Sequence, residues 1–115
     1  MQKNMNTELM SKDLTIEYNQ FKKTIIIKES NHKIELISSE RSNQYGNPIF
    51  DILNWNGFCS ISKTTRGDYF NLFLKLNDKY YRAFQKIDEY EEERNILFRS
   101  FREVEKIDGK WENKQ

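Results

Sequence analysis

The spacing of apolar and polar residues along the chain predicts a series of short strands followed by one helix. The segments LTIEY, TIIIKE and KIELIS are short, rich in isoleucine and separated by the turn-prone pairs NQ and NH, which is typical of strands in a meander. Two-residue turns at these pairs would place Glu17 opposite Lys22 and Ile26 opposite Ile37. We therefore expect three antiparallel strands in this part of the chain.

The segment NPIFDILNWNG supports two interpretations. A short helix would use Asn47 as its N-cap and Pro48 as its first residue, and it would end before Gly57. A strand is also compatible, because Asn56-Gly57 is a strong signal for a tight hairpin turn. The pattern of the hairpins that follow favours the strand.

Tight turns at the NG, RG and ND dipeptides of residues 56–78 would bring apolar residues of four strands together. They place Ile52 opposite Ile61, and Ile61 opposite Leu72. They also place Leu72 opposite Ala83. Because all three turns agree, we expect one apolar face, consisting of Phe50, Ile52, Cys59, Ile61, Phe70, Leu72, Leu74, Tyr81 and Ala83.

The C-terminal part of the chain has the features of a long amphipathic helix. Asp88 followed by Glu91 suits a helix N-terminus, and Gly109 is a suitable stop. Apolar residues recur there at helical spacing, namely Tyr90, Ile96, Leu97, Phe98, Phe101, Val104, Ile107 and Trp111. The expected fold class is α+β, an antiparallel β-sheet meander of about six to seven strands followed by one long C-terminal amphipathic helix packed on the sheet.

The chain of 115 residues suits one domain. We expect a polar N-terminal arm at residues 1–12, a single α+β domain at residues 13–109 and a polar C-terminal tail at residues 110–115. Cys59 is the only cysteine, and the sequence has neither a stretch typical of a secretory signal nor an apolar run long enough to span a membrane. These features predict a cytoplasmic protein.

Charge and composition add two constraints. The formal net charge is only +1, so any binding of nucleic acid must depend on a local concentration of basic residues. The chain has one alanine and one valine but many isoleucine, asparagine and lysine residues, as in proteins from AT-rich genomes. This composition suggests a bacterial, phage or mobile-element origin.

The stretch RGDYFNLFLKLNDKYYRAFQK carries the strongest candidate for function, because rings and cations alternate on one face of its hairpin. The expected register places Lys75 opposite Tyr80, and Phe73 opposite Arg82. Unpaired bases stack on exposed rings while Lys and Arg contact the phosphates. The candidate binding residues are Tyr69, Phe73, Lys75, Tyr80, Arg82, Phe84 and Lys86.

A purely structural interpretation of these residues is also open. The helix must cover one face of the sheet, and if it covers this one the rings belong to the core while the cations extend past the helix edges. If the helix covers the face that contains Leu72 and Leu74, the rings are exposed and the binding interpretation is favoured. The sequence does not distinguish these two arrangements.

Catalytic and metal-binding patterns are missing from the sequence. His32 is the only histidine, so no histidine-based triad or multi-histidine metal site can form. Cys59 is expected in the core, and the four glycines are scattered among turns rather than grouped in a phosphate-binding loop. The acidic residues 88–93 suit a solvated first helical turn. We expect no enzymatic activity, no catalytic residues, no metal and no cofactor.

Four antiparallel strands closed by a long helix, over residues 50–107, resemble in outline the single-stranded nucleic-acid binders of the PUR and Whirly type. The expected function is a small, non-enzymatic binding protein that contacts RNA, single-stranded DNA or a nucleoprotein complex. The alternative is an inhibitor or adaptor that binds a protein partner, of the anti-defence, anti-CRISPR-like kind, through a sheet edge or the helix surface. A homodimer is compatible with either function, and no membrane partner is expected.

Overall fold

A computed structural model describes residues 14–29, 32–38, 41–53, 56–87 and 95–114. These residues form eleven strands and contain no α-helix. In chain order the strands are β1 (Leu14–Asn19), β2 (Thr24–Glu29), β3 (His32–Ser38), β4 (Arg41–Ser42), β5 (Pro48–Ile52), β6 (Gly57–Lys63), β7 (Tyr69–Leu76), β8 (Lys79–Lys86), β9 (Ile96–Phe98), β10 (Arg102–Ile107) and β11 (Lys110–Asn113).

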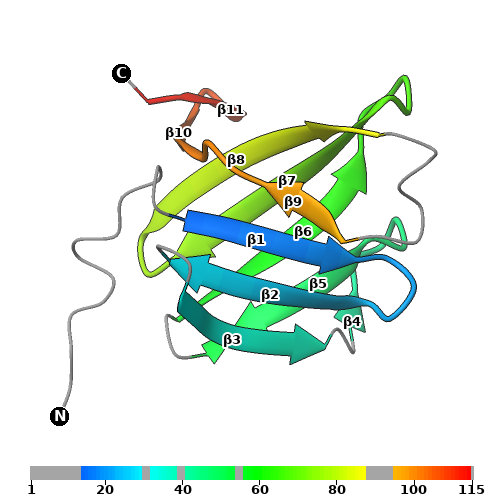
Figure 1. Cartoon of the computed structure of the whole chain (residues 1–115). Coiled ribbons are helices and arrows are strands. Elements are labelled where there is room, and N and C mark those ends of the chain that lie inside the picture. The colour runs from blue at the N-terminus through cyan, green and yellow to red at the C-terminus, as the bar shows by residue number, and fades with distance from the viewer. Residues whose placement is uncertain (1–13, 30–31, 39–40, 54–55, 88–94, 115) are drawn as a thin grey trace, which may run out of the picture.

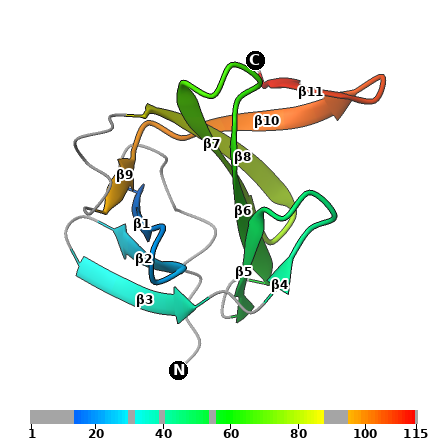
Figure 2. The same ribbon diagram turned by 90° about the vertical axis from the view of Figure 1, so that its right-hand side faces the viewer.

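The strands form two antiparallel sheets that pack face to face. One sheet has four strands in the order β3-β2-β1-β9, and the other has seven in the order β11-β10-β8-β7-β6-β5-β4. In Figure 1 the smaller sheet lies in front of the larger one, and Figure 2 shows the two layers side by side. β9 lies next to β8 and β3 lies next to β5, so the two sheets approach each other along both margins.

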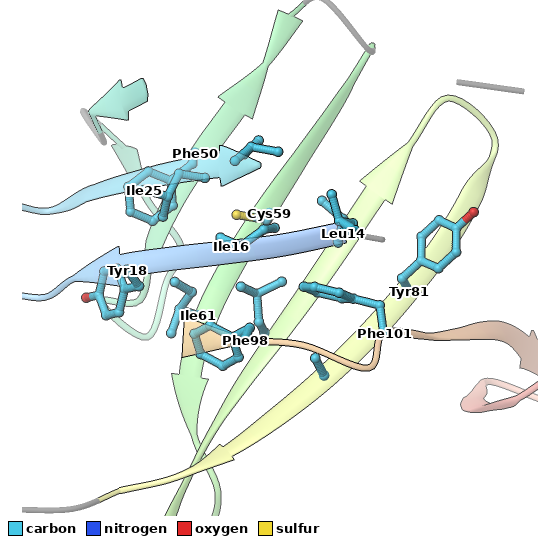
Figure 3. Packing of buried hydrophobic residues seen from close by; sticks show 14 of the residues in the cluster. Leu14, Ile16, Tyr18, Ile25, Phe50, Cys59, Ile61, Tyr81, Phe98 and Phe101 are labelled. Carbon is cyan, nitrogen blue, oxygen red and sulfur yellow. The ribbon is translucent and has the colours of Figure 1, made fainter. Parts of the chain in front are cut away.

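The hydrophobic core lies between the two sheets (Figure 3). Every second residue of β1 is buried, starting from Leu14, and β7 shows the same alternation. This period of two is the consequence of strand geometry, in which successive side chains point to opposite faces. All nine residues that the sequence assigned to one apolar face are buried there, which confirms that prediction.

Two of the three hairpins predicted for residues 48–86 have the expected register. Ile61 lies opposite Leu72, and Leu72 lies opposite Ala83. The first hairpin differs, because Ile52 lies opposite Gly57 rather than Ile61. This difference of four positions is an even number, so the same side chains still point into the core. β5 is a strand, as expected, and not a short helix.

The β1–β2 hairpin has a longer turn than expected. Asn19 Oδ1 accepts hydrogen bonds from the backbone amides of Phe21 (3.0 Å) and Lys22 (2.9 Å). Because the strands pair only from Asn19 and Thr24 outward, Glu17 lies opposite Ile26 and the predicted partner Lys22 lies in the turn. The side-chain amide of an asparagine stabilises such a wider turn at its first residue.

The register of β2 with β3 also differs from the prediction. Ile26 lies opposite Leu36 instead of Ile37, and the register shifts between Ile27 and Lys28. The predicted turn residue Asn31 lies outside the described residues. A bulge of this kind moves one strand by a residue relative to its partner, and no local signal in the sequence indicated it.

The predicted C-terminal helix is wrong, and with it the α+β fold class. Residues 96–98 and 102–107 are strands β9 and β10, which pair with β1 and β8. Ser100 has a positive φ of 57°, which is incompatible with a continuous α-helix. The proposed cap, Asp88 and Glu91, lies outside the described residues. The resemblance to PUR and Whirly proteins depended on this helix and does not hold.

Gly109, the predicted helix stop, is instead one of the two central residues of a hairpin turn, together with Asp108. The φ angles of Asp108 and Gly109 are +51° and +82°, and Ile107 lies opposite Lys110. Asp-Gly is a preferred sequence for such a turn, because both central residues need a positive φ. The segment expected to be a polar tail, 110–115, therefore contains strand β11. The predicted arm at residues 1–12 lies outside the described residues.

Candidate functional site

The seven-stranded sheet has one side that the smaller sheet does not cover, and we call it the outer face. Its residues alternate with the core residues along each strand. In β6 to β8 and in the C-terminal hairpin they are Phe58, Ser60, Ser62, Tyr69, Asn71, Phe73, Lys75, Tyr80, Arg82, Phe84, Lys86, Arg102, Val104, Lys106, Trp111 and Asn113. All seven predicted binding residues lie on this face.

The pairing of the predicted residues follows the expected register. Lys75 lies opposite Tyr80, Phe73 opposite Arg82, and Tyr69 opposite Lys86. The element that covers the other face is a second sheet rather than a helix, and it covers the side that contains Leu72 and Leu74. The arrangement is therefore the one in which the rings of the hairpin lie outside the core.

Two outer-face rings are widely accessible, whereas the others are partly buried. Phe84 is 50% exposed and Tyr69 is 41% exposed. Phe73 and Tyr80 are only partly exposed, because they contact each other with ring centroids 5.8 Å apart. The accessible rings are thus concentrated at one end of the β7–β8 hairpin.

Trp111 joins the partly buried rings, a position that its predicted place on a helix did not indicate. Its ring centroid lies 4.9 Å from that of Phe73 and 4.8 Å from that of Tyr80. Phe58 extends the cluster at 6.3 Å from Phe73. Val104, which has the same orientation as Tyr80, is only 2% exposed and lies outside the inter-sheet core. These five residues form a small second cluster on the outer face, which we call the aromatic cluster.

The cluster exists because the sheet is strongly coiled. β11 and β7 are separated by β10 and β8 in the strand order. In a flat sheet, strands three positions apart would be about 14 Å from each other. The contact between Trp111 and Phe73 therefore requires the C-terminal hairpin to curl over the outer face, as Figure 2 shows.

Basic side chains dominate the outer face, although the net charge of the chain is only +1. Lys75, Arg82, Lys86, Arg102 and Lys106 share its orientation. Among the described residues of β5–β8, β10 and β11, the one acidic residue with this orientation is Asp51. The guanidinium of Arg41 neutralises Asp51 through hydrogen bonds of 2.9 and 2.7 Å. The charge of the face is therefore positive.

Arg82 and Arg102 lie directly opposite each other on β8 and β10. Neither forms an ion pair within the described part of the chain. The neighbouring Glu103 points to the other side of β10, and its carboxylate accepts a hydrogen bond of 3.2 Å from Lys114 Nζ. Two like charges on facing residues repel each other, so this pair is a local cost to the fold.

Three of the cations also have contacts within the protein. Lys75 Nζ donates hydrogen bonds to the backbone carbonyl oxygens of Asn56 (3.3 Å) and Asn77, so it connects two turns. The guanidinium of Arg82 lies 5.5 Å from the centre of the Phe84 ring. Lys106 lies 5.9 Å from the Trp111 ring. Lys75 therefore has a structural role, while Arg82 and Lys106 lie within cation–π distance of Phe84 and Trp111.

The rest of the described chain offers little catalytic chemistry. Burial raises the pKa of the Cys59 thiol well above its ordinary value, which disfavours the reactive thiolate. No group of three or more His, Cys, Asp and Glu side chains in the described residues is arranged to hold a metal ion. Nor does this part of the chain contain a helix that could cross a membrane.

The chain matches no protein-family model, no curated protein and no solved structure. The function is therefore argued from the chemistry of the outer face.

Proposed function

We propose that the protein binds single-stranded nucleic acid through the outer face of its seven-stranded sheet. The observation that carries the proposal is the combination on one surface of five cations and two accessible rings, Tyr69 and Phe84, with no free carboxylate among the described residues of the strands that form it. Lys and Arg contact the phosphates of a strand, and unpaired bases stack on exposed rings. A net charge near zero excludes general attraction, so binding depends on this local surface.

A single strand suits this surface better than a duplex. Stacking on Tyr69 or Phe84 requires a base whose flat face is free, and in a duplex that face is occupied by neighbouring bases. The outer face also offers no α-helix among the described residues that could enter a major groove. The proposed ligand is RNA or single-stranded DNA, bound in the cytoplasm.

Fluorescence anisotropy with labelled single-stranded RNA, single-stranded DNA and duplex DNA tests the proposal. We expect micromolar or tighter binding of a single strand that weakens steeply as salt rises, because phosphate contacts release counterions. The variant Arg82→Glu/Lys86→Glu should bind at least about tenfold more weakly while its fold is retained.

A matched control is Lys22→Glu/Lys23→Glu, which changes the net charge equally in the exposed β1–β2 turn. This control should retain binding if the outer face is the site. Failure of all three ligands to bind at low salt would contradict the proposal. Copurification of a stoichiometric protein partner after nuclease and high-salt treatment would instead support the protein-binding inhibitor or adaptor.

A further inference from the structure

We infer that Arg82 and Arg102 together form a phosphate subsite, and that Phe84 beside them receives the base of the adjoining nucleotide. The inference rests on the proposed function and deepens it, because it assigns the position of one nucleotide unit on the outer face. The ligand chemistry is a phosphate group with a planar base next to it.

The strand register brings the backbone positions of Arg82 and Arg102 together. Arg82 and Arg102 are direct partners in the pairing of β8 with β10, and facing side chains begin about 4.5–5.5 Å apart in such a pair. Each guanidinium has five N–H donors in a planar fork that matches the geometry of phosphate oxygens. Two such forks on neighbouring strands can therefore contact one phosphate from two sides.

The protein supplies no counterion for this pair within the described residues. Asp51 is held by Arg41, and Glu103 faces the other side of the sheet, where it pairs with Lys114. Among the described residues, the repulsion between Arg82 and Arg102 therefore has no counterion to offset it. A bound anion would form charge-assisted contacts with both guanidinium groups. It would also offset their mutual repulsion, which makes the binding free energy more favourable.

Phe84 is the ring best placed to accept a base next to that phosphate. The guanidinium of Arg82 already lies 5.5 Å from the Phe84 ring centre, and the ring is half exposed. Phe73 lies directly opposite Arg82, but it packs with Tyr80 in the aromatic cluster against Trp111. Phe84 lies outside this cluster and is half exposed, whereas the cluster mainly positions the C-terminal hairpin.

The first test uses inorganic phosphate as the probe. The melting temperatures of the wild type, Arg82→Gln, Arg102→Gln and Lys110→Gln are compared in phosphate and in chloride of equal ionic strength. Lys110→Gln is the matched control, because it removes one charge from the same hairpin, on the side opposite to Arg102. We expect phosphate to stabilise the wild type and the control but neither arginine variant. An equal response of all four proteins would overturn the subsite.

The second test is a double-mutant cycle with a labelled oligonucleotide. If one phosphate contacts both side chains, Arg82→Gln and Arg102→Gln should each weaken binding and the double variant should be little weaker than either. The slope of log affinity against log salt should fall by about 0.7 for the lost phosphate. Phe84→Ala should weaken binding roughly tenfold or more without changing this slope.

The outcomes separate the inference from the proposed function. If the wild type binds no oligonucleotide, the proposed function fails. If the wild type binds but the arginine variants and Phe84→Ala match Lys110→Gln, only the subsite is overturned. Oligonucleotides with and without a 5′-phosphate distinguish a terminal phosphate from an internal phosphodiester, because only a terminal site loses affinity when that group is removed.

Discussion

The ring centroid of Trp111 lies 4.9 Å from that of Phe73, although their strands are separated by two others in the sheet. Through this contact the C-terminal hairpin packs against the outer face and contributes to its curvature. It also leaves Phe84 and Tyr69 as the rings with the most accessible surface on that face. The shape of the candidate site thus depends on a residue far along the chain from the hairpin that carries most of it.

Replacing Trp111 by alanine should loosen the C-terminal hairpin more than the rest of the protein. The change removes ring contacts with Phe73 and Tyr80, each worth about 0.5–1.5 kcal/mol beyond the buried area. We expect a loss of about 1–3 kcal/mol in the free energy of unfolding, measured by urea denaturation. Amide hydrogen exchange should accelerate mainly in β10 and β11. Trp111→Phe keeps a ring in place and serves as the control. If amide exchange in β10 and β11 of Trp111→Ala is as slow as in the wild type, the ring contacts do not stabilise the hairpin.

Removal of one charge from the arginine pair should stabilise the free protein. Arg102→Gln relieves the repulsion with Arg82 and is expected to raise the free energy of unfolding by about 0.2–1 kcal/mol. Denaturation in low salt measures this gain, and added salt should reduce it, because exposed charges are screened. Arg102→Lys retains the charge and should show no comparable gain. A destabilised Arg102→Gln protein would show that the guanidinium has an intramolecular role.

A side chain at Gly57 should disrupt the start of β6. A Cβ atom there would lie 1.8 Å from the backbone carbonyl oxygen of Lys75, which a backbone shift alone can relieve. We expect Gly57→Ala to lower the free energy of unfolding by about 3 kcal/mol, the upper end of the range for overpacking. The control is Gly67→Ala, where no atom lies within 4 Å and the cost is the strain of a φ of +79°. That strain is about 1–2 kcal/mol. Equal losses at the two positions would contradict the predicted overlap.

The acid stability of the protein should depend on Glu17. Hydrogen bonds from Lys28 Nζ (2.7 Å) and Asn95 Nδ2 (3.1 Å) lower the pKa of Glu17 below its usual 4.5. Because the pKa is lower in the folded state, the contribution of this group is complete above the unfolded pKa. It is lost as the pH falls through the folded pKa.

Glu17→Gln should therefore flatten the decline of stability below about pH 4.5, measured by denaturation at several pH values. The difference should stay below about 1 kcal/mol, because the ion pair is partly exposed to solvent. Lys28→Gln removes the other partner of the same ion pair. It should flatten the decline of stability over the same pH range. Parallel pH profiles for the wild type and Glu17→Gln would contradict this account.

Residues 69–86 show how far local patterns determine structure. Their turns join strands that are adjacent in sequence, so turn chemistry and alternation were sufficient to predict the pairing of Phe73 with Arg82. The same logic placed the seven candidate residues on one face. It missed Arg102, Lys106 and Trp111, because their positions depend on the pairing of β10 with β8, which no local turn specifies.

The error in residues 96–109 has a related physical cause. Ile96, Phe98 and Phe101 are buried between the sheets, whereas Val104 is buried in the aromatic cluster, so the apolar stripe does not lie on one surface. Gly109 suits a helix stop as well as it suits the Asp108-Gly109 turn that the structure shows, so this local signal did not distinguish helix from hairpin. Pairing with distant strands, which supplies the hydrogen bonds and the burial, outweighed the helical spacing.

The amino-acid sequence by itself determined which side of each central strand is apolar, because side-chain direction follows from a period of two and from local turns. It also determined that cations and rings alternate on the opposite side of the β7–β8 hairpin. Only the tertiary structure decided that a second sheet covers the apolar side and that the C-terminal hairpin curls over the other. Both depend on contacts between strands distant in the chain, whose stability comes from shared burial rather than from any local pattern.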